Sequence, residues 1–180
     1  NMCYMEKGER IKKLTEASDM IINCESGIFS GAFRGRSDEF VDSSSEVPGD
    51  HLFEKMISGA YHGKVISHTI KLASEAGLLS EAFGQISEPF SLSQIDEFYI
   101  GKRNEISDMR TGKDEERIRE IIDDSFERAA KLLCANVAAV CLHVDGGKSA
   151  ERPLYLVLEG SGFEKSLILP GKLNRHFNEF

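Results

Sequence analysis

Glutamates at two turns are the first groups in this sequence that have the chemistry and the placement for a binding site. Glu25 follows the apolar run 20–24 and precedes Ser26 and Gly27, so its carboxylate stands where a predicted strand ends. Ligand sites of α/β proteins gather at such strand ends. The alternative is a solvated glutamate in a surface turn, and both interpretations stay open at this level.

Glu54 is the second candidate carboxylate. It falls in the first turn of a predicted helix, a few residues after Pro48 and Gly49. The helix dipole favours a carboxylate at that position whether or not a ligand binds there, so a purely structural role is the alternative. The neighbouring Lys55 and the nearby Asp50 add nothing specific to either interpretation.

The run 145–148, Asp-Gly-Gly-Lys, resembles part of a phosphate-binding loop. A Walker loop, however, needs G-x-x-x-x-G-K-[ST] between a strand and a helix, whereas this run follows a predicted helix and precedes a predicted strand. We therefore interpret it as a helix C-cap and turn.

Metal and disulfide chemistry find no support in the spacing of the histidines and cysteines. The five histidines form no pair with metal-ligand spacing and a third ligand, and the four cysteines form no C-x-x-C pair. Cys134 and Cys141 lie on an apolar helical pattern, so we expect them to be buried thiols.

The composition is that of an ordinary globular chain, with 41% hydrophobic and 29% charged residues in 180. The formal net charge of −8, without a lysine and arginine stripe, argues against a nucleic-acid partner. It does not argue against a nucleotide, whose phosphates are usually held by backbone N–H groups and a metal. Because no stretch has the apolar length of a membrane span and the first residues do not resemble a signal peptide, we expect no membrane partner and a cytoplasmic location.

The elements that must position the two glutamates are predicted from periodicity. Apolar runs at 3–5 and 20–24 predict a β-hairpin whose charged loop contains Gly8. The segment 31–49 is rich in Gly, Ser and Asp and reads as a loop with a helical turn at 38–41. One long helix is then predicted, with Asp50 as its N-cap and Gly77 as its C-cap.

The second half of the chain is predicted to be an irregular segment followed by helix, strand and helix. Residues 78–113 show no regular pattern. An apolar stripe at 118–140, with acidic residues at 114–116, predicts a long helix that ends at Gly146 and Gly147. A strand is predicted at 153–158, a turn at 160–162 and a final helix at 170–180, so that the whole is a mixed α/β layer.

Three segments, read together, resemble eukaryotic-type hexokinases and glucokinases. Residues 1–6 are similar to the family's N-x-C-Y-M-E, residues 22–29 to its I-N-x-E-W-G-x-F, and residues 48–63 to its N-P-G-x-x-x-[FY]-E-K-[ML]-[IV]-S-G-x-Y-x-G. All three occur in the family's order and at its spacings, which makes the match specific. Residues 128–132 are similar to the family's R-A-A-x-L helix, and residues 159–161 occupy the place of its V-G-V-D-G-[ST] segment.

The resemblance implies a fold and an activity. The expected fold is α/β, of the ribonuclease H-like, actin-type ATPase class, with residues 1–180 as the C-terminal portion of the hexokinase large domain. The small domain and both chain ends of the family fold would be absent. The expected activity of the intact protein is phosphorylation of a hexose such as glucose at its 6-hydroxyl, with ATP and Mg²⁺.

The resemblance also implies site residues, by position. The family's sugar-binding residues correspond to Asn1, Glu25 and Glu54, and the family's backbone approach to the nucleotide corresponds to Gly59. The chemistry suits a sugar, because carboxylates accept charge-assisted hydrogen bonds from hydroxyls, while an Asn side chain both donates and accepts.

Some of the family's catalytic parts lie upstream of these motifs, according to the same resemblance. The aspartate that accepts the proton of the sugar hydroxyl and the D-x-G-G-T phosphate loop both belong there, so no catalytic residue and no metal ligand is assigned within residues 1–180. We expect these residues alone to be inactive. Sheet edges and apolar helix faces left without partners would favour self-association.

Departures from the family pattern keep other functions open. Ser26 replaces the family tryptophan, Ala60 stands where some members have lysine, and His51 stands where a glutamine often contributes to the pocket. A non-catalytic hexokinase-like module that binds sugar or acts in regulation is one alternative. A kinase for a different sugar or polyol is another, since loss of the tryptophan reshapes the pocket.

Overall fold

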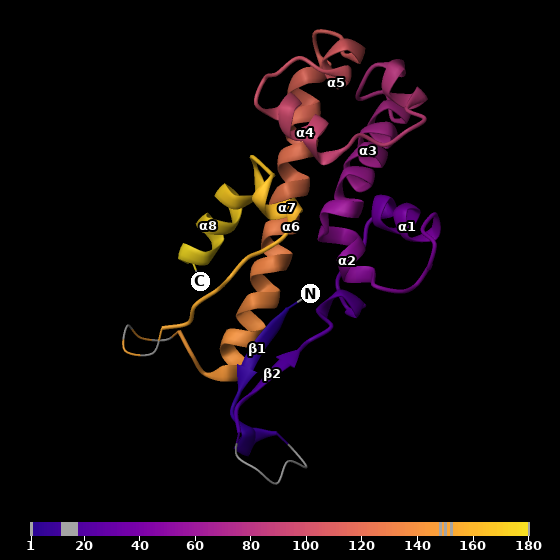
Figure 1. Cartoon of the computed structure of the whole chain (residues 1–180). Helices are drawn as coiled ribbons and strands as arrows, with labels where there is room; N and C mark the ends of the chain where they lie inside the picture. Colours follow the sequence, from indigo (N-terminus) through magenta and orange to yellow (C-terminus); the bar gives the residue numbers. More distant parts are fainter. Residues whose placement is uncertain (1, 12–17, 148, 150, 152, 180) are drawn as a thin grey trace.

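A computed structural model of the chain describes residues 2–11, 18–147, 149, 151 and 153–179. It is a mixed α/β structure with an antiparallel hairpin at one end of a stack of helices (Figure 1). Strand β1 (Cys3–Glu6) pairs with β2 (Met20–Asn23), and a 3₁₀ turn, η1 (Gly8–Arg10), follows β1. The predicted hairpin is therefore confirmed, and its strands contain Tyr4, Ile21 and Ile22, whose aromatic and β-branched side chains suit strands.

The longest element is α6 (Asp114–Val144), which runs beside the hairpin at one end and beside the shorter helices at the other (Figure 1). Its buried face includes Ile118, Ile122 and Phe126, as the apolar stripe predicted. The helix ends at Asp145, a left-handed C-cap with φ 53°, before Gly147 with φ 76°. The interpretation of Asp-Gly-Gly as a helix end is thus confirmed, while Lys148 lies outside the described residues.

The single long helix predicted after Pro48 is wrong, because it is two helices. These are α2 (Leu52–Ile57) and α3 (Gly59–Glu75), separated at Ser58, whose φ of −77° and ψ of 151° are extended. Ser and Gly side by side have low helix propensity, which favours a break at 58–59. The N-cap of α2 is His51 rather than Asp50.

The predicted C-cap at Gly77 is confirmed. Gly77 follows α3 with φ 73°, and the amide of Leu78 donates to Ala73 O over 2.8 Å, which is the Schellman pattern. The helical turn predicted at 38–41 is also confirmed, as part of a longer helix, α1 (Arg36–Ser43).

The prediction that residues 78–113 are irregular is wrong. The segment contains a 3₁₀ turn, η3 (Glu81–Gln85), and two short helices, α4 (Leu92–Tyr99) and α5 (Glu105–Met109). Each helix begins with a capping box, at Ser91 for α4 and at Asn104 for α5. The Ser-x-x-Gln pattern at 91–94 was the signal that periodicity alone overlooked.

The strand predicted at 153–158 is also wrong. The segment has no regular structure, and Tyr155 and Val157 are 90% and 76% exposed. A strand is stabilised by the ladder of a neighbouring strand, and β1 and β2 pair only with each other among the described residues. A short helix, α7 (Ser161–Glu164), stands at the predicted turn, and α8 (Leu169–Glu179) confirms the final helix.

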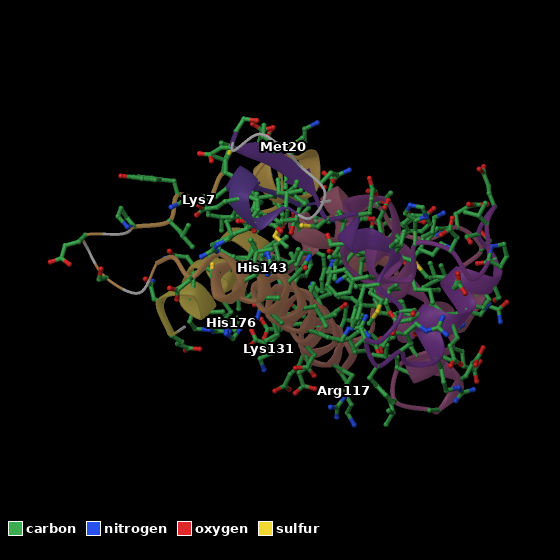
Figure 2. All side chains as sticks on the ribbon, turned by 90° about the horizontal axis from the view of Figure 1, so that it is seen from below. Lys7, Met20, Arg117, Lys131, His143 and His176 are labelled. Carbon is green, nitrogen blue, oxygen red and sulfur yellow. The ribbon has the colours of Figure 1, made fainter. Side chains whose placement is uncertain are left out.

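The core lies between α3, α6 and the short elements that cover them. Phe83, Phe98 and Phe126 are among its fully buried side chains. Helix α8 is held on α6 by Glu127, which His176 Nε2 approaches to 2.8 Å and which Arg175, Lys172 and Lys131 surround. His176 and Lys131 are labelled in Figure 2. Partial burial acts to raise the pKa of Glu127, but the hydrogen bonds and charges of these groups lower it to about 2.

The cysteines are free thiols, and Cys134 and Cys141 are half-buried rather than buried. Both lie in the later part of α6, where Cys134 packs against the edge of the core. Within the described part of the chain, no helix combines the length and the apolar character that crossing a membrane requires.

Candidate functional site

A cavity of about 670 Å³ lies where the hairpin, the junction of α2 and α3, α6 and the segment 155–160 meet. Its size is within the range of small-molecule sites. Glu54 and Gly59, two of the residues that the sequence analysis selected, line it, and so do Ser26 and Gly27 of the turn after β2.

Glu25 forms the turn that brings the chain from β2 to this cavity. It is left-handed, with φ 45° and ψ 39°, and it precedes the 3₁₀ turn η2 (Ser26–Ile28). Its carboxylate accepts a hydrogen bond from Asn23 Nδ2 and is exposed outside the cavity. A residue with a Cβ is costly in this conformation, and such strain clusters at functional sites.

Glu54 faces the same turn from α2. A Cβ placed on Gly27 would lie 3.1 Å from Glu54 Oε2 and 3.3 Å from Glu54 Cβ, so the glycine leaves room for the carboxylate. The rings of Phe29 and Phe53 meet edge to face, 6.1 Å apart, and join the turn to α2. The structure thus brings the Glu25 turn and Glu54 together, across Gly27.

His51 is a second strained residue beside Gly27. Its φ is 49°, and its Cδ2 atom would lie 3.6 Å from a Cβ on Gly27. Two of the three non-glycine residues with positive φ in the described chain therefore converge on this glycine. The His51 ring lies 2.9 Å from Asp50 Oδ2, and hydrogen bonds from His51 hold the pKa of the Asp50 carboxyl below its usual range.

Gly59 begins α3 at the other side of the cavity. A Cβ there would lie 3.2 Å from the Cα of Gly162 in α7, and one on Gly162 would lie 3.3 Å from the Cα of Gly59. Two backbones thus approach each other at the N-terminal turn of α3, where N–H groups and the helix dipole favour anions. The hydroxyl of Ser58, which also lines the cavity, is buried without a partner among the described residues.

His62 closes the inner wall of the cavity. Its side chain is buried, its Nε2 lies 2.9 Å from Ser125 Oγ, and its ring meets Phe126 edge to face. Burial first, and then the charge of Arg128, lower the pKa of His62 to about 4. The imidazole is therefore neutral near neutral pH and serves as a packed polar wall.

Two glycines and one lysine of this region were not predicted from the sequence as functional residues. Gly27 and Gly162 matter because backbone or carboxylate approaches them closely, and glycine after an apolar run was the available signal. Lys55, which added nothing specific in the sequence, is 3% exposed and bonded to Asp42. Asn1 lies outside the described residues, so its predicted role stays a prediction.

Comparison with known proteins identifies the family. A family model described as Hexokinase matches residues 1–180. The chain belongs to the hexokinase family. The motifs around Glu25 and Glu54, which suggested this family, are therefore hexokinase motifs and not chance matches.

Relatives from plants and animals agree with this assignment. Hexokinase-1 of Oryza sativa subsp. japonica is 28% identical over 91% of this chain, and the match covers 38% of that protein. Hexokinase-3 of Mus musculus is 31% identical over 78% of this chain and 17% of that protein. Two of the plant hexokinases match nine tenths or more of this chain. The chain spans about two fifths of the length of each of them.

Solved hexokinase structures show the fold. A hexokinase from Schistosoma mansoni complexed with glucose matches 98% of this chain and 44% of its own, with a TM-score of 0.80 and 19% identity. A second structure, described as hexokinase, matches 88% of this chain with a TM-score of 0.71. The expected ribonuclease H-like, actin-type α/β fold is thereby confirmed.

No cluster of three or more His, Cys, Asp or Glu side chains that could hold a metal occurs within the described ranges.

Proposed function

We propose that the intact protein transfers the γ-phosphoryl group of ATP to the 6-hydroxyl of a glucose-like hexose, and that this chain supplies part of the sugar pocket and the nucleotide side. The observation that supports it most is the convergence of the Glu25 turn and Glu54 on Gly27 at the cavity. The solved relative with the same fold is complexed with glucose.

In this proposal Glu25 and Glu54 bind the sugar. Each carboxylate accepts hydrogen bonds from sugar hydroxyls, and Asn1 adds a group that both donates and accepts. Glu54 is already at the cavity, whereas Glu25 must exchange its hydrogen bond with Asn23 for one with the sugar. Carboxylates fixed in this way discriminate between sugars, because a missing hydroxyl leaves a polar group without its partner.

The nucleotide lies on the side of Gly59. The close approach of Gly59 and Gly162 leaves backbone, not side chains, at the N-terminal turn of α3, which suits the approach of ATP. Mg²⁺ then binds chiefly through the phosphates and neutralises their charge.

Residues 1–180 form part of the large domain in this proposal, and the aspartate that accepts the hydroxyl proton belongs to a small domain upstream. Catalysis is then a property of the whole protein, in which two domains close over the sugar and exclude water. The proposed location is the cytoplasm, although one rice relative is named as chloroplastic.

A non-catalytic sugar-binding or regulatory module is the second candidate. Ser26 and Ala60 favour it, because both line the cavity at positions where family members have larger side chains. Such a protein would bind a hexose without turning it over.

Release of ADP by the full-length gene product, measured with glucose, ATP and Mg²⁺ beside a control without sugar, tests the proposal. Glucose-dependent release is expected. If no hexose raises the rate above the control, hexose kinase activity is excluded, and glucose binding by calorimetry then decides for or against the binding module.

A further inference from the structure

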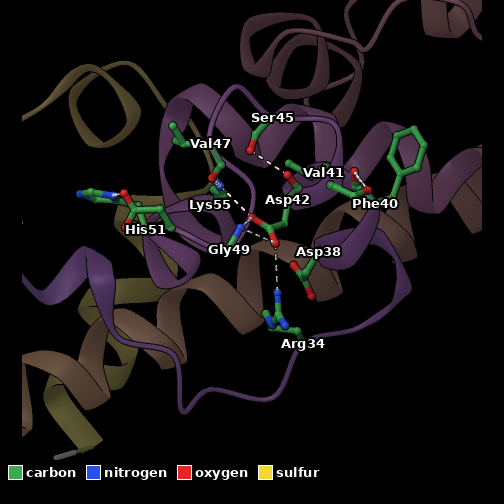
Figure 3. Close-up of polar contacts among 12 residues, drawn as sticks. Arg34, Asp38, Phe40, Val41, Asp42, Ser45, Val47, Gly49, His51 and Lys55 are labelled. Carbon is green, nitrogen blue, oxygen red and sulfur yellow. Dashed lines mark hydrogen bonds and ion pairs between the residues drawn. The ribbon is translucent and has the colours of Figure 1, made fainter.

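Lys55, next to Glu54 in α2, carries a buried charge that is fully paired. Its side chain is 3% exposed, and its Nζ lies 2.7 Å from Asp42 Oδ1 and 2.7 Å from Val47 O (Figure 3). A buried ammonium is tolerated only when it is paired and hydrogen-bonded. Helix α2 is thus tied both to α1, which carries Asp42, and to the loop that leads into α2.

The carboxylate of Asp42 also binds the loop that leads into α2. It accepts hydrogen bonds from the Gly49 amide at 3.0 and 3.2 Å, and Arg34 Nη1 lies 3.5 Å away (Figure 3). Burial of the carboxylate acts to raise its pKa, but the hydrogen bonds from Lys55 and Gly49 and the two cationic charges bring the pKa below its usual range. The carboxylate is therefore ionised and holds three segments together.

This contact fixes how α2 is turned about its own axis. Helix α2 has six residues, too few to hold its shape without tertiary contacts. Consecutive side chains on a helix point about 100° apart. Anchoring Lys55 toward α1 therefore sets the direction of Glu54, which faces Gly27.

We propose that Asp42 and Lys55 are positioning residues for hexose binding, which hold Glu54 and the His51 loop in the orientation that the sugar requires. Neither residue touches the sugar. The proposal rests on the proposed function, since it assigns to this ion pair the geometry of the same sugar site.

Asp42→Asn in the full-length protein is the direct test. Asparagine keeps the size and one acceptor for Gly49 but removes the charge opposite Lys55. We expect the KM for glucose to rise about tenfold or more while the KM for ATP stays unchanged, since only the sugar side loses its geometry. Lys55→Met, which leaves Asp42 with Arg34 and Gly49, should have the same effect and serves if Asp42→Asn does not fold.

Asp38→Asn is the matched control. Asp38 is also buried in α1, where Arg128 binds it at 2.7 and 2.8 Å, but that pair joins α1 to α6 and not to the loop before α2. We expect Asp38→Asn to lower the melting temperature without changing the KM for glucose. An equal rise of this KM in both variants, or no rise in either folded Asp42 or Lys55 variant, would overturn the proposal.

Amide hydrogen exchange of residues 47–57 separates this inference from the proposed function. We expect faster exchange in Asp42→Asn than in Asp38→Asn, whether or not the protein phosphorylates glucose; equal exchange overturns the anchoring. If exchange is faster in Asp42→Asn than in Asp38→Asn, and yet the unsubstituted protein neither turns over nor binds any hexose, the proposed function fails. The role in sugar binding then fails with it, while the anchoring of α2 stands.

Discussion

The backbone at Glu25 is held in a conformation that suits glycine better than glutamate. Its φ of 45° is left-handed, and the residue is exposed, so packing does not explain why glutamate stands there. His51, with φ 49°, shares this property on the other side of Gly27. In our account the strain at Glu25 persists because its side chain is needed at the sugar site, which is the trade-off of stability against function found at many sites.

Glu25→Gly should separate stability from activity. Glycine adopts positive φ without strain, so we expect the melting temperature of the full-length protein to stay the same or rise slightly. We expect kcat/KM for glucose to fall about 100-fold, since hydrogen bonds to a charged group contribute about 1.5–3 kcal/mol. Thermal unfolding and steady-state kinetics measure the two effects; a large fall in melting temperature, or unchanged kcat/KM, would contradict the assignment.

At the scale of elements, α3 depends on a close approach to the chain before α4. A Cβ on Gly63 would lie 2.5 Å from Phe90 O, and the amide of Phe90 donates to Ser67 Oγ over 2.8 Å, one turn further along α3. Gly63 is thus a spacer that lets the two segments touch. The space around it is filled by backbone, which cannot move aside as a side chain could.

Gly63→Ala should destabilise the protein by about 1–3 kcal/mol, the usual cost of overpacking a core. Gly171→Ala in α8 is the matched control, because among the described residues no atom beyond its chain neighbours and its own helix backbone lies within 4 Å of the new methyl group, and alanine is the better helix former. Chemical denaturation of both variants measures the difference. An equal effect of the two substitutions would show that the contact at Phe90 is looser than the structure has it.

The elements that were predicted correctly from the sequence are those whose apolar residues recur at a regular spacing. The hairpin, α6 and α8 carry enough regular apolar positions to be assigned without tertiary information. Helices α4 and α5 were missed because they are short and depend on capping boxes, which spacing of apolar residues does not reveal. The segment 153–158 has the composition of a strand, but composition does not show whether a neighbouring strand is present to pair with it.

The site was predictable in part, for a similar reason. Glu25 and Glu54 were found through family motifs, and both are local patterns. Their convergence on Gly27, and the pairing of Lys55 with Asp42 between two helices, are contacts between segments that no local pattern specifies. The burial of Lys55 could not be predicted from a local pattern, because a lysine in a helix is usually solvated.

At the scale of the whole molecule, α1, α3 and α6 are joined by buried polar groups. His62 of α3 bonds Ser125 of α6, and Asp38 of α1 bonds Arg128 of α6. At the hairpin, His143 Nε2 of α6 lies 3.0 Å from Glu6 Oε2 of β1, and Figure 2, seen from below, labels His143 in the same region as Lys7 and Met20 of the hairpin. These contacts hold the hairpin and the helices around the cavity as one unit.

The buried His62 should make stability fall in mild acid. Its pKa is about 4 in the folded protein against 6.5 for an unperturbed histidine, so the unfolded state takes up the proton first as pH falls. The contribution is complete above pH 6.5 and is lost as pH falls from there toward 4, by about 2 kcal/mol at pH 5. Denaturation at several pH values should show a shallower dependence for His62→Gln, and identical slopes would contradict a neutral, buried His62.

The central claim, that this hexokinase chain binds the sugar through Glu54, is tested most directly by the kcat/KM for glucose of full-length Glu54→Gln. Glu46→Gln, an exposed glutamate in the loop before α2, is the matched control. We predict a loss of about 100-fold for Glu54→Gln, from the lost charge-assisted hydrogen bonds. The control should keep the unsubstituted value, and both variants should keep their melting temperature. A Glu54→Gln protein with unchanged kcat/KM would contradict the account.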